Sequence, residues 1–414
     1  MDKKQIFIKN IYYLFFILCL LSCNHVKKNV QEIGVNDHLY VIDMDKAEYE
    51  EKILLSEICS NMKTIILETN DDVLINDVGG VQVYKDYIFV LDDKKDANLF
   101  AFNKQGKFIR KYGSRGNGPG EYLSIKDFTI DPEKEIIFLA DDYGDQILCY
   151  DMNTGKFISK ISIDKGATNC LNIQYNNGKL YTDVNYYQPD ENAVLLREID
   201  MATGNIKNCW LEAKRYNMGW DGGVQIISKM EESFFYEKNQ ETCKYVNVFM
   251  DTIISIGKNG IAPYAVFKEK NWITTKGLTL IIEDTKDGIL QAIRDRGFSF
   301  QISNYMEWND YISFNYLKGK DLYFVLFNKK NGKIRTSKLL LNDLGYKNVG
   351  IVSSFVCSDE NGLYEMIGMF SIDGFVQSIQ QYDILKESLD KYEELMNLPE
   401  DTNPILFYYE FKKE

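Results

Sequence analysis

The amino-acid sequence predicts an all-β protein, a six-bladed β-propeller whose N- and C-terminal strands close the ring, with a few helices at its periphery. Two observations predict this fold. A polar turn that ends in glycine recurs along the chain, and short runs of alternating apolar residues flank each copy, as in β-hairpins. The glycines of the first three copies, Gly106, Gly155 and Gly204, are 49 residues apart, the spacing of propeller blades built from four short strands.

The repeat continues beyond these three turns. Looser copies end at Gly260 and Gly332, and the wider gaps before them, 56 and 72 residues, indicate insertions. The strands that precede the turns repeat as well, because Tyr87–Asp92 parallels Ile136–Asp141. The five turns therefore predict five blades, with the polar turn between the third and fourth strand of each.

A sixth blade can be completed from the two ends of the repeat region. Asn403–Phe411 has the pattern of a strand with no turn after it, and His38–Asp43 has that of a strand with no partner before it. Pairing these two segments would close the ring and remove both sheet edges. A β-sandwich or a β-solenoid is the alternative, but the long period of the repeat disfavours both.

Three segments interrupt the strand pattern with apolar residues at helical spacing. We expect helices within Ala47–Met62, Asp284–Arg294 and Tyr382–Leu398, packed on the outside or the bottom of the propeller. Binding of a partner by one of these helices is the alternative.

Residues 1–23 have the parts of a signal peptide. Lysines at positions 3, 4 and 9 give a positively charged start. Ile11–Leu21 is an almost unbroken apolar stretch, too short for a comfortable transmembrane helix, which needs about 20 apolar residues.

The apolar stretch ends in Leu-Leu-Ser-Cys, which resembles the lipobox of bacterial lipoproteins. Cys23 is therefore the predicted lipidated residue, and its acyl chains would anchor the protein to a membrane. Residues 24–37 are polar and suit a tether, and residues 38–414 would form the propeller domain. An ordinary secreted protein or an N-terminal anchor helix is the alternative.

The composition excludes several classes of function. The formal net charge of -13 argues against a nucleic-acid partner, which needs a clustered basic surface. The chain has two histidines, His25 and His38, and both precede the repeats, so a serine or cysteine triad, an HExxH zinc site and a three-histidine metal site lack their imidazole. None of the eight cysteines forms a CxxC pair, which leaves no support for a zinc or redox centre. We therefore expect no cofactor, no metal and no identifiable catalytic residue.

The loop Gly113–Tyr122, with the sequence GSRGNGPGEY, resembles the signature of NHL-type repeats. Together with the lipobox, the segment Ile65–Thr69 and the closing Asn-Pro strand, the chain resembles the six-bladed β-propeller lipoproteins of Bacteroidetes. The resemblance covers residues 38–411 and is weak between about 210 and 350. It implies the fold and a cell-envelope location, and it confers no established activity.

Surface-exported lipoproteins of that group often carry acidic residues directly after the lipidated cysteine. Here Asn24–Lys28 is basic. We therefore expect a protein anchored to the outer membrane and facing the periplasm.

Binding loops on a rigid scaffold are where a site is expected. Gly113–Tyr122 would connect the outer strand of one blade to the inner strand of the next, and the acidic loops Asp92–Asp96 and Asp141–Asp145 would connect second to third strands. All would share the face at the channel mouth. The candidate ligand-binding residues are Arg115, Asn117, Glu121, Tyr122, Asp141 and Tyr143.

The alternative for these residues is structural, with Glu121 and Asp141 capping loop backbone groups and Tyr122 packing between blades. The acidic loops lack the spacing of a calcium-binding EF-hand. The boxes of six-bladed sialidases are absent, and a carboxylate pair for glycoside hydrolysis cannot be identified among 61 acidic residues.

The function expected from the sequence is that of a non-catalytic, monomeric envelope protein that binds a glycan, a peptide or a protein partner. One alternative is a carboxylate-dependent polysaccharide hydrolase or lyase. The other is a structural subunit of an outer-membrane uptake assembly.

Overall fold

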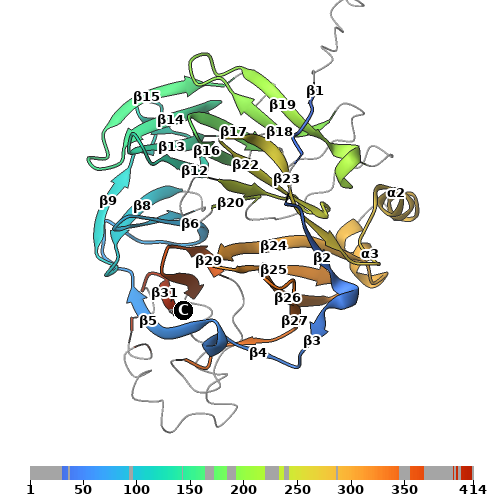
Figure 1. The fold of residues 1–414 in the computed structure, drawn as a ribbon. Helices are drawn as coiled ribbons and strands as arrows, with labels where there is room; N and C mark the ends of the chain where they lie inside the picture. The colour runs from blue at the N-terminus through green and yellow to red at the C-terminus, as the bar shows by residue number, and fades with distance from the viewer. Residues whose placement is uncertain are drawn as a thin grey trace, which may run out of the picture.

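The computed structural model shows six small antiparallel sheets arranged as blades around a central axis (Figure 1). The six-bladed propeller predicted from the repeat is thereby confirmed. The structure describes residues 30–35, 38–92, 97–141, 143–163, 172–183, 193–219, 233–236, 242–285, 288–344, 355–367, 395, 398–399 and 402–412.

Each blade has four strands, and the first lies nearest the axis. The first three blades comprise β6 (Val78–Tyr84), β7 (Tyr87–Asp92), β8 (Asn98–Asn103) and β9 (Phe108–Tyr112); β12 (Ile125–Asp131), β13 (Ile136–Asp141), β14 (Gln146–Asp151) and β15 (Phe157–Ser162); and β16 (Ile173–Asn176), β17 (Lys179–Asp183), β18 (Val194–Ile199) and β19 (Ile206–Glu212).

The remaining blades follow the same order except for the last. They comprise β20 (Phe234–Tyr236), β21 (Cys243–Tyr245), β22 (Thr252–Gly257) and β23 (Gly260–Lys268); β24 (Ser299–Trp308), β25 (Tyr311–Lys318), β26 (Asp321–Asn328) and β27 (Ile334–Ser337); and β29 (Phe355–Ser358), β30 (Gly362–Ile367), β31 (Ile405–Phe411) and β5 (Cys59–Ile66).

All five predicted glycine turns lie between the third and fourth strand of a blade, as expected. The glycines have positive φ, and at two of them the neighbouring blade also excludes a side chain. A Cβ on Gly106 would lie 2.1 Å from the carbonyl oxygen of Ile66, and one on Gly204 would lie 1.7 Å from that of Ser162. The repeated glycine therefore allows each turn to pack on the outer strand of the preceding blade.

The core lies between neighbouring blades because both faces of each sheet are covered. Phe89, Leu139 and Phe314, for example, are fully buried. Aromatic side chains span the joints, as where Phe138 of the second blade stacks on Tyr175 of the third with ring centroids 5.5 Å apart. Aromatic side chains therefore contribute to the packing between blades.

The ring is closed by an N-terminal strand against a C-terminal one, but the predicted N-terminal strand is wrong. β31 pairs antiparallel with β5, with Ile405 opposite Ile66, whereas Tyr40–Asp43 forms β2 and lies outside the fourth blade. The buried residues of β5 are few, since only Cys59 and Ile65 are fully covered, so its alternation of apolar and polar residues is weak.

Asn403 fastens this closure just before β31. Its side chain is fully buried, accepts the N–H of Ile75 at 2.7 Å, and donates to the carbonyl oxygens of Glu68 (2.7 Å) and Val73 (3.1 Å). The Asn-Pro pair and the opening segment around Glu68 therefore belong to one ring-closing unit.

The N-terminal segment follows the outer rim before it reaches β5 (Figure 1). β1 (Val30–Gln31), β2 (Tyr40–Asp43) and β3 (Glu48–Tyr49) pair in parallel with β19, β23 and β27, the outermost strands of three successive blades. We call residues 30–49 the N-terminal belt. β4 (Ile53–Leu54) then pairs with β28 (Leu340–Leu341).

Of the three predicted helices, one is wrong, one is present and one lies almost wholly outside the described residues. The helix expected within Ala47–Met62 is wrong, because this segment contains β3, β4, a short 3-10 turn (Leu55–Glu57) and the start of β5. The edges of two blades supply backbone partners that override its helical spacing. The segment Asp284–Arg294 does contain a helix, α3 (Ile289–Asp295), next to the unpredicted α2 (Thr275–Asp284), whose N-cap is Thr274. The predicted helix Tyr382–Leu398 lies almost wholly outside the described residues. No helix in the described part of the chain is long and apolar enough to cross a membrane.

Candidate functional site

The glycine-rich loop predicted as a site is held together by its own residues. β10 (Ser114–Arg115) and β11 (Glu121–Tyr122) pair in parallel, and the N–H of Gly118 donates to Oε2 of Glu121 at 2.7 Å. A Cβ on Gly116 would lie 2.0 Å from the same carboxylate oxygen. Glu121 therefore organises the loop backbone.

Tyr122 is packed inside the propeller. Its side chain is buried, its hydroxyl donates to Oδ1 of Asn98 at 3.2 Å, and burial raises the pKa of the phenol. Close by, the hydroxyl of Tyr150 donates to the carbonyl oxygen of Gly120 at 2.7 Å. These contacts join the loop to the first two blades.

Asp141 is also occupied by backbone groups. Its carboxylate accepts the N–H groups of Leu123 (3.1 Å), Ser124 (3.0 Å) and Gly144 (3.0 Å) and the amide of Gln146 (2.9 Å). It therefore fixes the point at which the chain enters the inner strand of its blade.

The same arrangement recurs in the neighbouring blades. Asp92, which ends the second strand of the first blade, accepts the N–H groups of Asn76 (3.2 Å) and Asp77 (3.1 Å). Asp183, in the equivalent place of the third blade, accepts the N–H of Asn172 at 3.2 Å. An aspartate at this position is thus a repeated structural device.

The other three predicted residues present their side chains to the surface. Arg115 and Asn117 are exposed at the loop, and the exposed fraction of Tyr143 is 75%. None of the six predicted residues lines the central cavity described next. Their role in ligand binding stays a prediction.

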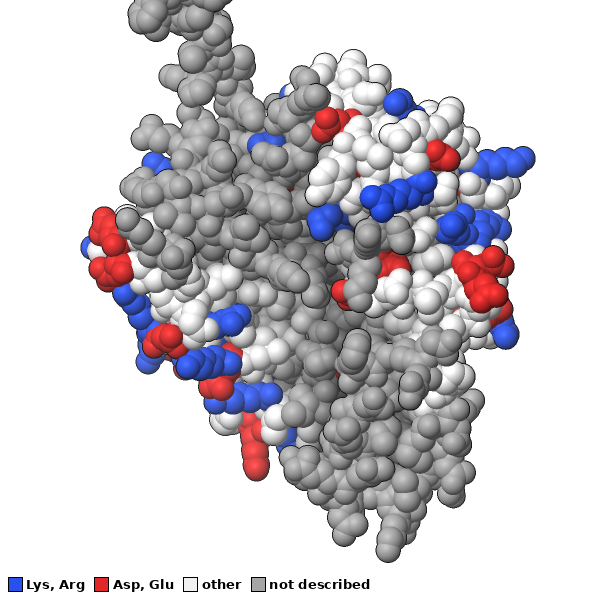
Figure 2. Space-filling model, turned by 180° about the vertical axis from the view of Figure 1, so that it is seen from behind, with Lys and Arg blue, Asp and Glu red and all other residues white. Residues whose placement is uncertain are grey.

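A cavity of about 510 Å³ lies in the central channel, lined by the innermost strands of all six blades. It extends to the end where first and second strands are joined, since Lys85, Asp86 and Asn361 belong to its wall. Acidic and basic side chains are interspersed on the described part of the surface in Figure 2, without a continuous basic area. A cavity of this volume falls in the range of about 300–1,000 Å³ that is usual for small-molecule sites.

Asp127 of β12 is the central acid of the cavity wall. Its carboxylate accepts the N–H of Ile173 at 2.7 Å and that of Phe128 at 2.8 Å. Burial raises the pKa of Asp127 to about 8, although these backbone hydrogen bonds oppose the change. Near neutral pH this carboxyl group can therefore carry a proton and donate it in a hydrogen bond.

A polar relay lies beside Asp127, where the third and fourth blades meet. The amide of Asn172 donates to Oγ of Ser233 at 3.1 Å and to Oδ2 of Asp183 at 3.3 Å, and the Ser233 hydroxyl donates to Asp183. Burial raises the pKa of Asp183 to about 6, against the effect of the Ser233 hydrogen bond. Asn172 and Ser233 line the cavity in front of this carboxylate.

Gln174 of β16 has a buried acceptor that has no partner among the described residues. Its side chain is buried and its amide nitrogen donates to the carbonyl oxygen of Tyr175 at 2.5 Å, but none of the described residues donates to its Oε1. Leaving such an acceptor unpaired costs about 1–3 kcal/mol. Gln174 lines the cavity, but its Oε1 is covered, so a donor in the channel would reach this atom only after the side chain rotates.

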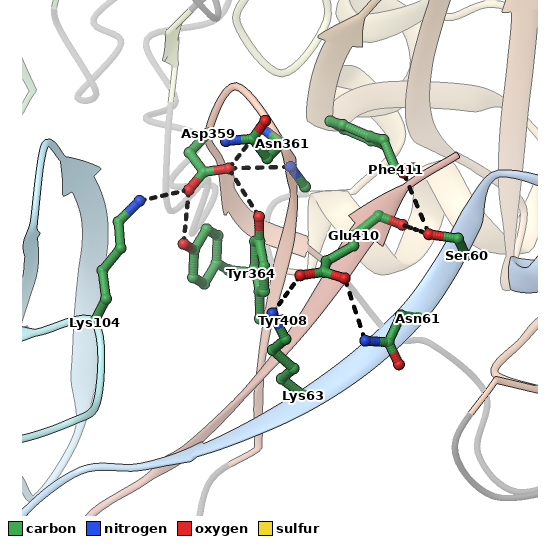
Figure 3. A network of polar contacts seen from close by, with 11 residues as sticks. Ser60, Asn61, Lys63, Lys104, Asp359, Asn361, Tyr364, Tyr408, Glu410 and Phe411 are labelled. Carbon is green, nitrogen blue, oxygen red and sulfur yellow. Dashed lines mark hydrogen bonds and ion pairs between the residues drawn. The ribbon is translucent and has the colours of Figure 1, made fainter. Parts of the chain in front are cut away.

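A second cluster of polar side chains, around Asp359, lies in the cavity wall between the sixth and first blades (Figure 3). Asp359 accepts from Lys104 at 3.0 Å, from the hydroxyl of Tyr364 at 2.8 Å and from the N–H of Asn361 at 2.9 Å. Burial opposes it, but these hydrogen bonds hold the pKa of Asp359 below its usual range. Figure 3 shows Lys104 reaching from its own blade toward Asp359, so the pair also bridges the last joint of the ring.

The sequence did not single out the cavity residues. Asp127 is one acid among 61, and Gln174 and Ser233 have no motif. Asp183 could have been found by its place at the end of a second strand, which matches that of Asp141. Among the described residues no group of three or more metal-ligating side chains gathers, so the structure identifies no metal site there.

Comparisons with known proteins found a matching family and similar solved structures. The family model described as a domain of unknown function, DUF4934, matches residues 39–410. A crystal structure from Bacteroides fragilis, named "putative exported protein", is similar with a TM-score of 0.68 at 18% identity and covers 90% of this chain and 99% of its own. A DUF4221 family member from Bacteroides vulgatus has a TM-score of 0.49 at 10% identity, covering 86% of this chain and 97% of its own. Comparison with curated proteins found no match.

Proposed function

The chain therefore belongs to the DUF4934 family, whose description assigns no activity, and on that premise we propose that it is a non-catalytic envelope protein that binds a small polar ligand in its central channel. The observation that carries the proposal is the cavity of about 510 Å³ with the polar side chains of Asn172, Gln174 and Ser233 in its wall. The ligand would be a molecule that donates hydrogen bonds, such as a short glycan or a peptide.

The surroundings of Gln174 support this ligand chemistry. Asn172 and Ser233 add polar groups to the same wall, while Phe128 and Phe234 add apolar surface. Polar and apolar groups contribute about equally to this wall, which suits a polar ligand.

The test is a binding screen with the mature chain carrying Cys23→Ala. Neutral saccharides, amino acids and short peptides would be screened by thermal shift, and hits measured by calorimetry. Gln174→Leu should lower affinity at least about tenfold, and it should lower stability by about 1 kcal/mol, because it also removes the donor to the carbonyl oxygen of Tyr175.

The matched control is Gln291→Leu, on the exposed face of α3 and outside the channel wall. Unchanged affinity in Gln174→Leu would contradict the channel proposal. If binding were instead lost in Arg115→Ala and Tyr143→Ala, the ligand would bind at the glycine-rich loop predicted from the sequence.

The hydrolase alternative is favoured by one observation, the raised pKa of Asp127. A carboxyl group that keeps its proton near neutral pH can act as a general acid, given a second carboxylate at about 5–10 Å. Turnover of a polysaccharide by the purified protein, lost in Asp127→Asn, would establish catalysis and overturn the non-catalytic proposal.

We also propose the finer location, an outer-membrane lipoprotein anchored through Cys23 and facing the periplasm. The lipobox supports it, and so does the similarity to a Bacteroides protein named as exported. Cys23→Ala should move the protein from the membrane fraction to the soluble fraction. Retention of the variant on the membrane would contradict the anchor.

A further inference from the structure

We propose that the lipid bilayer is the partner of an apolar patch on the outer rim, formed by Val35, Leu39 and Val41 of the N-terminal belt. The membrane would then lie against the edge of the third and fourth blades. This inference rests on the predicted lipidation of Cys23 and is independent of what the channel binds.

Exposed apolar side chains are concentrated in the N-terminal belt. The described residues include eleven large hydrophobic side chains that are exposed, and three of them fall within the seven positions from Val35 to Val41. Their exposed fractions are 94% for Val35, 44% for Leu39 and 44% for Val41. Ile42, the next residue along β2, is fully buried, so the strand directs Val41 away from the core.

The short segment between Cys23 and β1 limits which rim of the propeller can lie near the membrane. Only six residues separate Cys23 from Val30, where β1 already pairs with β19 of the third blade. Fully extended, this segment spans about 25 Å. A domain of this size has a radius of gyration of about 21 Å and is roughly 50 Å wide. The rim that carries β1 therefore stays near the bilayer, and the opposite rim lies out of reach.

The charge along the same segment is a further argument for this orientation. Lys27 and Lys28 lie between the anchor and β1 and would be attracted to anionic lipid headgroups. Beyond Val41 acidic side chains outnumber basic ones, with Asp45 exposed in the belt and Glu51 exposed just after it, so this part would be attracted less to the same lipids. Tyr49 is the one exposed large apolar residue of the described belt that lies beyond this change.

An edge-on attachment has a consequence for the channel. β1 and β2 lie on the outer rim, away from the central axis (Figure 1). With this rim on the membrane, the axis runs roughly parallel to the bilayer and both ends of the channel stay open to the aqueous phase.

The test compares two labelled positions in the full-length acylated protein reconstituted into vesicles of phosphatidylethanolamine and phosphatidylglycerol. Val41→Cys and Ile158→Cys are matched, since both replace an exposed β-branched residue, 44% and 51% exposed, on the outer strand of a sheet. Each would carry an environment-sensitive fluorophore, and lipids with a nitroxide would quench it. Cys59, Cys149, Cys209 and Cys243 are buried, and protein without the new cysteine gives the background of labelling.

We expect quenching at position 41 to exceed that at position 158 at least about twofold. Equal quenching at the two positions, or stronger quenching at 158, would overturn the orientation. Mass spectrometry of the N-terminal peptide tests the premise separately, because the absence of an acyl group on Cys23 would overturn the anchor itself. Neither result bears on ligand binding in the channel, which the calorimetry of the soluble chain measures.

Discussion

Asn403→Ala should strongly destabilise the propeller by opening its ring. The Asn403 side chain is fully buried and makes three hydrogen bonds, one from Ile75 and two to the carbonyl oxygens of Glu68 and Val73. Alanine would leave the N–H of Ile75 and the carbonyl group of Glu68 without these partners, whereas the Val73 carbonyl would keep the N–H of Asn70 at 3.4 Å. The hydrogen bond from the Asn403 N–H to Thr69 at 2.8 Å would remain available.

The size of the effect follows from the two groups left unpaired. Each costs about 1–3 kcal/mol, with the carbonyl group at the lower end, so the sum is about 3 kcal/mol. A domain is typically stable by about 5–15 kcal/mol in total. The variant should therefore remain folded in buffer at low temperature and unfold at a much lower denaturant concentration.

Urea unfolding followed by tryptophan fluorescence measures this effect, with Asn117→Ala as the control. Asn117 is exposed on the glycine-rich loop, so its removal should change the free energy of unfolding by no more than about 0.5 kcal/mol. A loss of less than about 1 kcal/mol in Asn403→Ala would refute the ring-closing role, because it would mean that water or neighbouring groups replace all three bonds.

Three further predictions concern the channel and the blade joints. Burial raises the pKa of Asp127 to about 8, so its contribution to stability is fully present below about pH 4 and is lost as the pH rises toward 8. Asp127→Asn should therefore lessen the fall in melting temperature over that range. An unchanged pH profile of the melting temperature would contradict this role of Asp127. Gly120→Ala should lower stability by about 2 kcal/mol or more, because φ is +76° there and a Cβ would lie 2.8 Å from Phe157; a melting temperature like that of wild type would show that the loop adjusts freely. Lys104→Ala should cost at most about 1 kcal/mol, less at high salt, because its bond to Asp359 is partly exposed; a larger, salt-independent loss in chemical denaturation would assign Lys104 a packing role.

Local signals made the repeated turns predictable. Gly106 and its equivalents combine a hairpin turn with a backbone approach that only glycine permits, so the requirement is written into a few adjacent residues. The aspartate that ends the second strand of the first three blades is equally local, which is why the structural alternative for Asp141 could be stated beforehand. These short-range requirements predicted five blades, and the sixth was inferred from the two ends of the repeat region.

The closing strand, β5, was not predicted because no local sequence signal marks it. β5 is an outer strand, and most of its side chains face solvent, so its sequence lacks the alternation that marked the inner strands. Its partner β31 lies at the other end of the chain, and no local pattern specifies that pairing. The segment was predicted as a helix because its few apolar residues fit a helical spacing.

The residues of the channel wall could not be predicted from the sequence for a related physical reason. Asp127, Gln174 and Ser233 come from three different blades, and their common position depends on how the blades are arranged around the axis. Each one alone looks like an ordinary polar residue at a strand or its edge. Only the assembled ring shows that Gln174 has an acceptor facing no partner.

The N-terminal belt also bears on the order in which the chain folds. Contacts of the belt, and of the residues that follow it up to β5, span long stretches of sequence. These are 177 residues between Gln31 and Asn208, 285 between Glu50 and Arg335, and 349 between Asn61 and Glu410. β1 can pair once β19 of the third blade is made, but β5 finds its partner only when β31 is synthesised. The first two blades can form from contiguous residues, but the ring stays open until β31 arrives. Such a high contact order predicts slow folding, during which the unpaired belt is open to misassociation with other chains.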